Sequence, residues 1–341
     1  MHCVVFEEVY TDLTFSQLEE STSVCPHLFC GKSTTLGFLI GMADFLTSTH
    51  RAKWIFSPQQ LVEKYTAANQ RAKQILEKGG VTLMEVDVDG SLSYPEPQTT
   101  ASDNAEKHSQ IKPVSIEEEQ CIKVFYENKL QEVCNNLHFP HKIQATALIF
   151  FKRFYLRWSV MEHQPNNLML TCIYAACKIE ENLVSAEELG KRVSQDHEIV
   201  LCNEMIVYQS LEFELIVYTP YRSVEGFNYM EELCNAGEDK RQALQNTARL
   251  EVDKMMLTDA PLLFPPGQLA LAALRNSNAL HQVVDFDSFL SRVFSHQNST
   301  HTMAELLESL DAIDSLVRKY RSPSEKELEH INGKLKSCWG L

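Results

Sequence analysis

The sequence predicts an all-α protein of two five-helix bundles, with additional N- and C-terminal helices outside them. Apolar residues recur at helical spacing, whereas the alternating pattern of strands is scarce anywhere in the chain. The organisation also repeats, because a helix of small apolar residues that begins after Pro165 has a counterpart after Pro265, about 100 residues later. These observations together favour two similar helical bundles over any fold that contains a sheet.

The first part of the chain contains one clear helix between two irregular segments. Residues 1–50 show no sustained periodicity, and we expect a poorly ordered arm there. The N-terminal helix is expected within 51–80, with Ser57 as its N-cap, Pro58 at its first position and a pair of glycines at its end. Residues 81–114, which hold prolines and a polar run, are expected to be a linker.

The first bundle is expected over residues 115–218. Ser115 and Glu118 form a capping box at its start, and Ser185 with Glu188 caps a short helix further on. The other predicted helices of this bundle are 115–137, 141–157, 165–179 and 196–212. Helix 165–179 is apolar nearly all round, so it should be central and surrounded by the others.

The second bundle is expected over residues 219–321, and a C-terminal helix over 322–341. The helices predicted after residue 219 are 241–257, 267–275, 285–294, 302–320 and a last one that starts near residue 324. Ser322-Pro323 matches a phosphorylation motif, but we expect a turn between two helices there.

The composition excludes several classes of function. Lysine and arginine number 31 against 46 aspartate and glutamate, a formal charge of −15, which disfavours direct nucleic-acid binding over a broad face. No apolar run approaches a membrane span, and the acidic first residues do not resemble a secretory signal. Ten cysteines without a CxxC pair point to a reducing compartment rather than to a disulfide scaffold.

The sequence also lacks the short motifs that accompany common enzyme chemistry. There is no GxxxxGK[ST] phosphate loop, GxGxxG turn, HExxH helix or GxSxG elbow. The twelve histidines show no metal-ligand spacing, and the acidic runs are typical of solvated helix faces. We therefore expect a helical binding module without a catalytic residue, metal or cofactor.

Several separate motifs resemble the cyclin box, and together they resemble the cyclin H family in its plant form. They are the sequences FFKRFYL at 150–156, MLTCIYAACKIEE at 169–181 and LEFEL at 211–215, followed by PYR at 220–222. Further similarity lies in AKWIF at 52–56 and LTDAPLL at 257–263, and the resemblance extends from about residue 42 to the end of the chain. It implies two five-helix cyclin boxes.

The resemblance also implies a function. A cyclin of this family is a regulatory subunit that binds and activates a cyclin-dependent kinase of the CDK-activating kinase complex, together with an assembly-factor subunit. That complex phosphorylates other cyclin-dependent kinases and, within TFIIH, the C-terminal domain of RNA polymerase II. Nuclear localisation is implied, with the cytoplasm as a second location. The alternative is a transcription factor IIB-like protein, which uses the same fold to bind DNA and polymerase directly.

The family pattern assigns kinase binding to five residues in the third and fifth helices of the first box and just after them. They are Lys178, Ile179, Glu204, Tyr208 and Leu215. The resemblance implies that the lysine donates to backbone carbonyls of the kinase and that the glutamate accepts from backbone amides. Pattern alone leaves ordinary explanations open: a cation that satisfies the end of its helix, a solvated glutamate and a core tyrosine.

Three further residues are candidate partner contacts. Trp54 and Phe56 either contact the kinase or act as a hydrophobic staple for the helix that follows, and Glu181 lies next to the kinase-binding motif. The sequence also departs from cell-cycle cyclins, because Lys152 stands where they carry an aspartate. The usual substrate-docking patch is absent from the first helix, so we assign no docking role to it.

Overall fold

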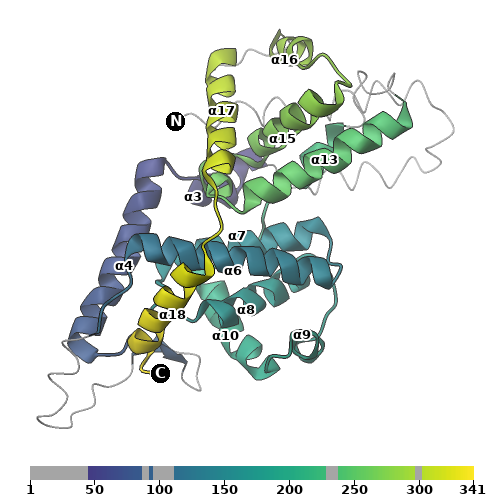
Figure 1. Ribbon diagram of the computed structural model, residues 1–341. Helices are drawn as coiled ribbons and strands as arrows, with labels where there is room; N and C mark the ends of the chain where they lie inside the picture. The colour runs from purple at the N-terminus through teal and green to yellow at the C-terminus, as the bar shows by residue number, and fades with distance from the viewer. Residues whose placement is uncertain (1–44, 87–91, 95–110, 228–236, 296–301) are drawn as a thin grey trace, which may run out of the picture. The chain divides into compact units, whose positions relative to one another are not determined.

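Helices make up nearly all the regular structure in the residues that the computed structural model describes, which are 45–86, 92–94, 111–227, 237–295 and 302–341 (Figure 1). The described residues fall into two units: those of 45–56 and within Tyr218–Tyr320 belong to unit 1, and those within Ser57–Val217 and Arg321–Leu341 belong to unit 2. The all-α prediction is confirmed. None of the helices described is long and apolar enough to cross a bilayer.

Unit 2 is organised around helix α8, as the sequence predicts. Its elements are α4 (Pro58–Gly79), β1 (Glu85–Val86), β2 (Leu92–Ser93), α6 (Ile116–Asn136), α7 (His141–Arg157), α8 (Pro165–Ile179), α9 (Ala186–Val193), α10 (His197–Ser210) and α18 (Glu325–Trp339). Helix α8 packs against α6, α7 and α10, and ten of its fifteen residues are buried. Helix α7 is equally deep, since every residue from Ile143 to Leu156 is buried.

The starts of these helices follow the capping signals in the sequence. Ser57, Ser115 and Ser185 each accept a hydrogen bond from the backbone N–H three residues further on, at 3.0–3.2 Å. Helix α4 ends where Gly80 adopts a left-handed conformation with φ of 74°. Local side-chain chemistry therefore sets the boundaries between which the tertiary packing occurs.

Unit 1 has a comparable central helix. Its elements are η1 (Phe45–Thr47), α3 (Thr49–Trp54), α11 (Pro220–Gly226), α13 (Glu238–Met256), α14 (Ala260–Leu263), α15 (Pro266–His281), α16 (Phe286–Ser295) and α17 (Met303–Lys319). Helix α15 packs against α11, α13, α14 and α17, and the small-residue run 269–274 is fully buried in it. It extends six residues beyond the predicted end at 275.

The prediction of an irregular arm over 1–50 is wrong for the residues that the structure describes, because 45–54 form the short helices η1 and α3. Ser48 caps α3 by accepting from the Arg51 backbone at 3.2 Å. Phe45 packs edge-on against His50 and Tyr218, each with ring centroids 5.4 Å apart, and the Tyr218 backbone N–H donates to His50. This order depends on a residue far away in the sequence, so local periodicity did not reveal it. Residues 1–44 lie outside the described part.

The predicted linker 81–114 contains a small pair of strands, and hydrogen bonds of Thr82 and Tyr94 attach it to the rest of unit 2. Strands β1 and β2 pair antiparallel, with Glu85 opposite Ser93. The buried Thr82 hydroxyl lies 2.8 Å from the Met161 carbonyl oxygen, and the Thr82 backbone N–H donates to Cys338 at the end of α18. The described ends of this segment are therefore attached to unit 2.

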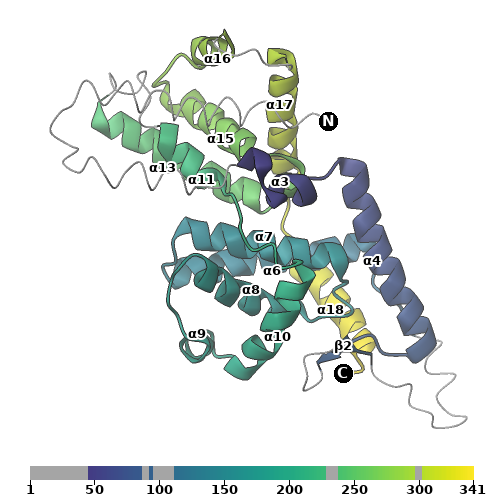
Figure 2. The same cartoon turned by 180° about the vertical axis from the view of Figure 1, so that it is seen from behind.

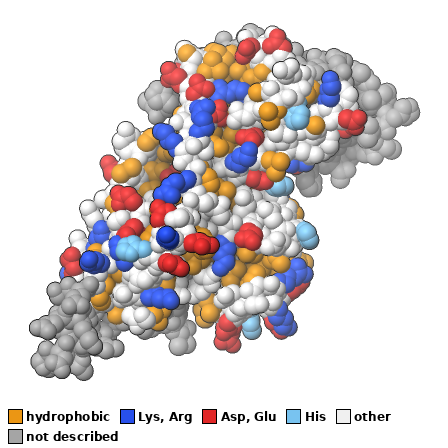
Figure 3. Space-filling view, in the orientation of Figure 1, with side chains coloured by type: hydrophobic (Ala, Val, Ile, Leu, Met, Phe, Trp, Pro, Cys, Tyr) orange, Lys and Arg blue, Asp and Glu red, His pale blue; other side chains and the backbone are white. Residues whose placement is uncertain are grey.

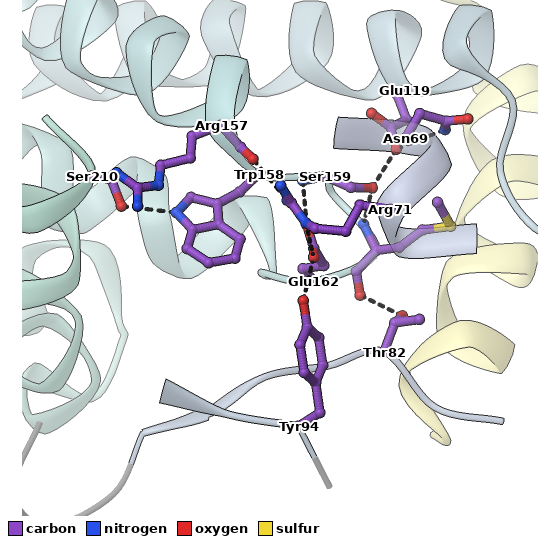
Figure 4. Close-up of polar contacts among 11 residues, drawn as sticks. Asn69, Arg71, Thr82, Tyr94, Glu119, Arg157, Trp158, Ser159, Glu162 and Ser210 are labelled. Carbon is purple, nitrogen blue, oxygen red and sulfur yellow. Dashed lines mark hydrogen bonds and ion pairs between the residues drawn. The ribbon is translucent and has the colours of Figure 1, made fainter. Parts of the chain in front are cut away.

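The second attachment is made by the buried carboxylate of Glu162, in the loop between α7 and α8, which binds side chains from other parts of unit 2 (Figure 4). It accepts from Nε and Nη2 of the Arg71 guanidinium at 3.0 and 2.6 Å, from the Tyr94 hydroxyl at 2.7 Å and from the Ser159 backbone N–H at 2.8 Å. Burial and the bond to Glu162 raise the pKa of Tyr94, so its hydroxyl remains a donor. This network joins α4 and β2 to the α7–α8 loop.

The outer surface mixes the two signs of charge. On the face shown in Figure 3, lysine and arginine side chains alternate with aspartate and glutamate side chains, and apolar atoms appear between them. Such a surface offers no broad basic area on this face for a phosphate backbone.

Candidate functional site

The five residues assigned to kinase binding lie on α8, on α10 and in the segment after α10. These two helices lie side by side in unit 2, with α9 at their ends (Figure 2). The indole N–H of Trp158, at the end of α7, donates to Ser210 at 2.8 Å and fixes the last turn of α10 (Figure 4). Four of the five residues are therefore positioned by packed helices, and Leu215 lies in the segment that follows α10.

Lys178, Glu204 and Tyr208 form one polar cluster. The lysine ammonium lies 2.7 Å from the Glu204 carboxylate, and the Tyr208 hydroxyl donates to the same oxygen at 2.7 Å. The lysine side chain is 47% exposed and the glutamate side chain 16% exposed. The hydrogen bond to Glu204 raises the pKa of Lys178, and burial followed by the bond to Glu204 raises that of Tyr208. The cluster thus presents an ion pair that is partly exposed to solvent.

An apolar surface accompanies this cluster. Leu201 and Met205 lie one helical turn apart on α10 and are 47% and 49% exposed. Phe213, in the segment after α10, is 60% exposed, and Ile216 and Leu183 are also exposed. Several large apolar side chains exposed on neighbouring elements are typical of a protein-binding surface.

The turn that carries Phe213 has an unusual backbone. Glu212 and Phe213 both adopt left-handed conformations, with φ of 54° and 58°. The Phe213 backbone N–H donates to the Tyr208 carbonyl oxygen at 2.9 Å. The buried Arg153 guanidinium on α7 donates to the Glu214 carbonyl oxygen at 3.4 Å. Desolvation lowers the pKa of Arg153 to about 9, which still leaves it charged at neutral pH. The turn is therefore held in one strained conformation that keeps Phe213 exposed.

The remaining predicted residues have less defined positions in this surface. Ile179 and Leu215 are half-buried, directly after Lys178 and within the strained turn. Glu181 is exposed just past the end of α8. Trp54 is buried and meets Phe56 edge-on, with ring centroids 6.5 Å apart, and both belong to unit 1.

Sequence reasoning missed Phe213, Leu201 and Met205. The LEFEL motif was used for Leu215 only, although its phenylalanine is the more exposed residue. The spacing of Leu201, Met205 and Tyr208 at i, i+4 and i+7 is a signal for one helix face, but periodicity does not tell an exposed face from a buried one.

No group of three or more histidine, cysteine, aspartate or glutamate side chains that could hold a metal occurs among the residues described. What the structure presents on α8 and α10 is a partly exposed polar pair together with exposed apolar side chains.

Family models match both units. The model of the cyclin C-terminal domain matches residues 219–318, and the model of the transcription factor TFIIB repeat matches residues 125–198. The first match lies within the residues of unit 1 and the second within those of unit 2.

Solved structures support the fold. A chain of the CAK complex from Chaetomium thermophilum, solved with ATP-γ-S, is 23% identical with a TM-score of 0.69, covering 86% of this chain and 88% of its own. A chain of the yeast TFIIK (Kin28/Ccl1/Tfb3) complex is 22% identical with a TM-score of 0.58, covering 80% and 99%.

Relatives in sequence are closer. Cyclin-H1-1 of Arabidopsis thaliana is 60% identical over 303 residues, which cover 88% of this chain and 90% of that protein. Cyclin-H of Xenopus laevis is 34% identical over 239 residues, covering 67% and 74%. With this identity over most of both chains, and with the same helical fold, the chain belongs to the cyclin H family.

Proposed function

We propose that this chain is the regulatory cyclin subunit of a CDK-activating kinase complex, and that it binds and activates a cyclin-dependent kinase without catalysing a reaction itself. The complex also contains an assembly-factor subunit and associates with TFIIH. It phosphorylates other cyclin-dependent kinases and the C-terminal domain of RNA polymerase II. It acts in the nucleus, with the cytoplasm as a second location. Support comes from the cyclin-H relatives and from the CAK and TFIIK complexes in which similar chains occur.

One observation of the structure carries the proposal at residue level: a charged pair lies beside exposed apolar residues on α8 and α10. Lys178 offers donors to backbone carbonyls of a partner helix, and Glu204 offers an acceptor to backbone amides. Ile179, Tyr208 and Leu215 contribute apolar contacts, and we add Leu201, Met205 and Phe213 to this set. Trp54, Phe56 and Glu181 remain candidates for peripheral contacts.

The mechanism follows from a conformational equilibrium. A kinase is active only when the glutamate of its αC helix meets the lysine of strand β3. A rigid surface that binds only this arrangement shifts the kinase towards it. A shift from 1:99 to 99:1 needs about 5.5 kcal/mol of differential binding, which three buried apolar anchors of about 2 kcal/mol each supply.

The TFIIB-like alternative rests on the match to residues 125–198. That match covers part of unit 2 only, whereas the cyclin relatives cover most of the chain. A formal charge of −15 also disfavours direct DNA binding. The cyclin function is therefore favoured.

The test is a charge reversal, Lys178→Glu with Glu204→Lys, in the chain co-expressed with a CDK-activating type kinase. The reversed pair keeps its own attraction, so unit 2 stays folded, but it presents the wrong charge to each partner group. Losing such contacts costs at least about 2 kcal/mol, or an affinity decrease of at least about 30-fold. Affinity is measured by titration calorimetry, and activity on a peptide of polymerase repeats.

A matched control is Glu251→Lys with Lys254→Glu on α13, where the ammonium and the carboxylate are 2.6 Å apart and partly exposed in the same way. This control should bind and activate the kinase normally. Normal co-purification and activity of the Lys178 and Glu204 variant would reject the assigned roles.

A further inference from the structure

The sequence contains three places where a serine or threonine precedes a proline: Ser57-Pro58, Thr219-Pro220 and Ser322-Pro323. Proline-directed kinases phosphorylate such dipeptides when the substrate lies in an extended conformation that the active site can reach. The structure places the three dipeptides in different surroundings. Their accessibility to a kinase can therefore be compared within one chain.

The first two dipeptides are parts of helix starts. Ser57 is the N-cap of α4, its hydroxyl accepts from the Gln60 backbone at 3.2 Å, and Pro58 is the first helical residue. Pro220 is likewise the first residue of α11 and is buried, with Thr219 only half-exposed before it. In both cases the chain after the acceptor is already helical, so it cannot extend through a kinase active site.

Ser322-Pro323 differs from both. Residues 320–324 form neither helix nor turn, contrary to the turn expected from the sequence, and Figure 1 draws them as irregular chain between α17 and α18. Backbone angles are extended at its two ends, with ψ of 131° at Tyr320 and 157° at Ser324. Ser322 is exposed, and the capping of α18 is performed by Ser324 instead. The Ser322 acceptor therefore has two non-helical residues on each side.

The local charges also suit a phosphate. Arg321 directly precedes Ser322, and it binds the Glu327 carboxylate with two nitrogens, at 3.1 and 2.7 Å. A phosphoryl group at Ser322 would carry close to two negative charges and compete with Glu327 for this guanidinium. Its position before the first turn of α18 is favourable for negative charge as well.

We propose that Ser322 is a phosphorylation site for a proline-directed serine kinase, and that it is the sole Ser/Thr-Pro acceptor of the folded chain. In the reaction the Ser322 hydroxyl oxygen bonds to the γ-phosphorus of ATP, and the bond from that phosphorus to the bridging oxygen breaks. ADP leaves with the bridging oxygen, and the hydroxyl proton passes to a carboxylate of the kinase.

The experiment incubates the purified full chain with Mg-ATP and an active mitogen-activated protein kinase, and maps phosphate by mass spectrometry. Synthetic peptides around residues 57, 219 and 322 receive the same treatment. We expect the folded chain to be modified at Ser322 and not at Ser57 or Thr219, whereas all three peptides are modified. The Ser322→Ala and Pro323→Ala variants should lose the incorporation.

Two results would overturn the proposal. Absence of phosphate at Ser322 in the folded chain, whether or not its peptide is modified, would show that this segment is no acceptor. Equal modification of Ser57 or Thr219 in the folded chain would show that helix capping does not protect an acceptor. The added kinase is independent of the bound partner, so either outcome leaves the cyclin function untouched.

Discussion

Two lysine–glutamate pairs of unit 2 have nearly the same geometry and different surroundings. Lys152 of α7 lies 2.6 Å from Glu127 of α6, with side chains 2% and 6% exposed. Lys178 lies 2.7 Å from Glu204, with side chains 47% and 16% exposed. Contact distance therefore does not distinguish the two pairs, and burial does.

The difference indicates what each pair can do. Removing one member of a buried pair leaves an isolated charge in the core, which is strongly destabilising. An exposed pair contributes little to stability because water screens it, and it can exchange partners when another protein binds. We therefore infer that Lys152 and Glu127 stabilise the fold, while Lys178 and Glu204 are available for recognition.

The largest effect should come from breaking the buried pair. Lys152→Ala leaves the Glu127 carboxylate buried without this cation, and we expect the free energy of unfolding to fall by about 3–5 kcal/mol. Lys178→Ala should change it by less than about 1 kcal/mol. Urea unfolding followed by circular dichroism measures both values.

The double variant Lys152→Met with Glu127→Leu provides the control, because it removes both charges and fills the space with apolar atoms. It should regain much of the stability lost in Lys152→Ala. If Lys152→Ala and Lys178→Ala destabilise equally, the distinction by burial is wrong.

A buried basic group without a carboxylate partner sharpens the same comparison. His163 lies between Phe154 and Trp158, with ring centroids 5.2 and 5.1 Å away. Burial, followed by the charge of Arg71, lowers its pKa to about 3 from 6.5. Between pH 6.5 and 3 the unfolded chain therefore binds a proton at His163 and the folded chain does not. The free energy of unfolding is undiminished by this group above pH 6.5 and decreases as pH falls towards 3.

The expected slope is about 1.4 kcal/mol per pH unit within that window. His163→Phe, which keeps an aromatic ring in place, should remove this slope while other groups still titrate. Unfolding free energies of both chains at pH 7, 6, 5 and 4 give the comparison. Equal slopes would mean that His163 accepts a proton in the folded chain.

Substitution of Phe213, in the strained turn after α10, should have a smaller effect on stability. We expect it to increase the free energy of unfolding and to weaken kinase binding. Phe213→Gly relieves a left-handed conformation and should raise the free energy of unfolding by up to about 1 kcal/mol. The same change removes an exposed aromatic ring and should weaken kinase binding at least about 30-fold. Chemical unfolding and calorimetric titration measure the two effects.

Phe213→Ala separates the two causes, because it removes the ring and keeps the strain. It should weaken binding as much as Phe213→Gly does but should be less stable than that variant. A glycine variant that unfolds more readily than the alanine variant would contradict the role of strain.

The sequence predicted the fold where the signals are local. The capping serines Ser57, Ser115 and Ser185 act on backbone groups three residues away, and the apolar run of α8 requires burial whatever surrounds it. The structure of residues 45–54 could not be predicted in this way, since it depends on Tyr218.

The candidate site shows the same limit. The resemblance assigned kinase binding to Lys178 and Glu204, and that assignment stays a prediction. Only the structure shows that the two side chains bind each other and share Tyr208. Exposure of Phe213 follows from two consecutive left-handed residues that are not glycine, and residue type gives no warning of them.

The smallest effect is expected at the exposed Arg321–Glu327 pair, which lies outside the candidate kinase-binding site and beside Ser322. The Arg321 guanidinium, together with Ser324, holds the pKa of Glu327 at about 2, below the ordinary 4.5. A lowered pKa means that the stabilising contribution is present above pH 4.5 and is lost as pH falls towards 2. Glu327→Gln should therefore reduce the decrease of the unfolding free energy between pH 4.5 and 2. The change should be much smaller than the one that His163→Phe causes at higher pH, because solvent screens the Arg321–Glu327 pair. Acid unfolding of the two variants side by side measures this order, and a larger effect at Glu327 would show that exposure does not weaken an ion pair in this protein.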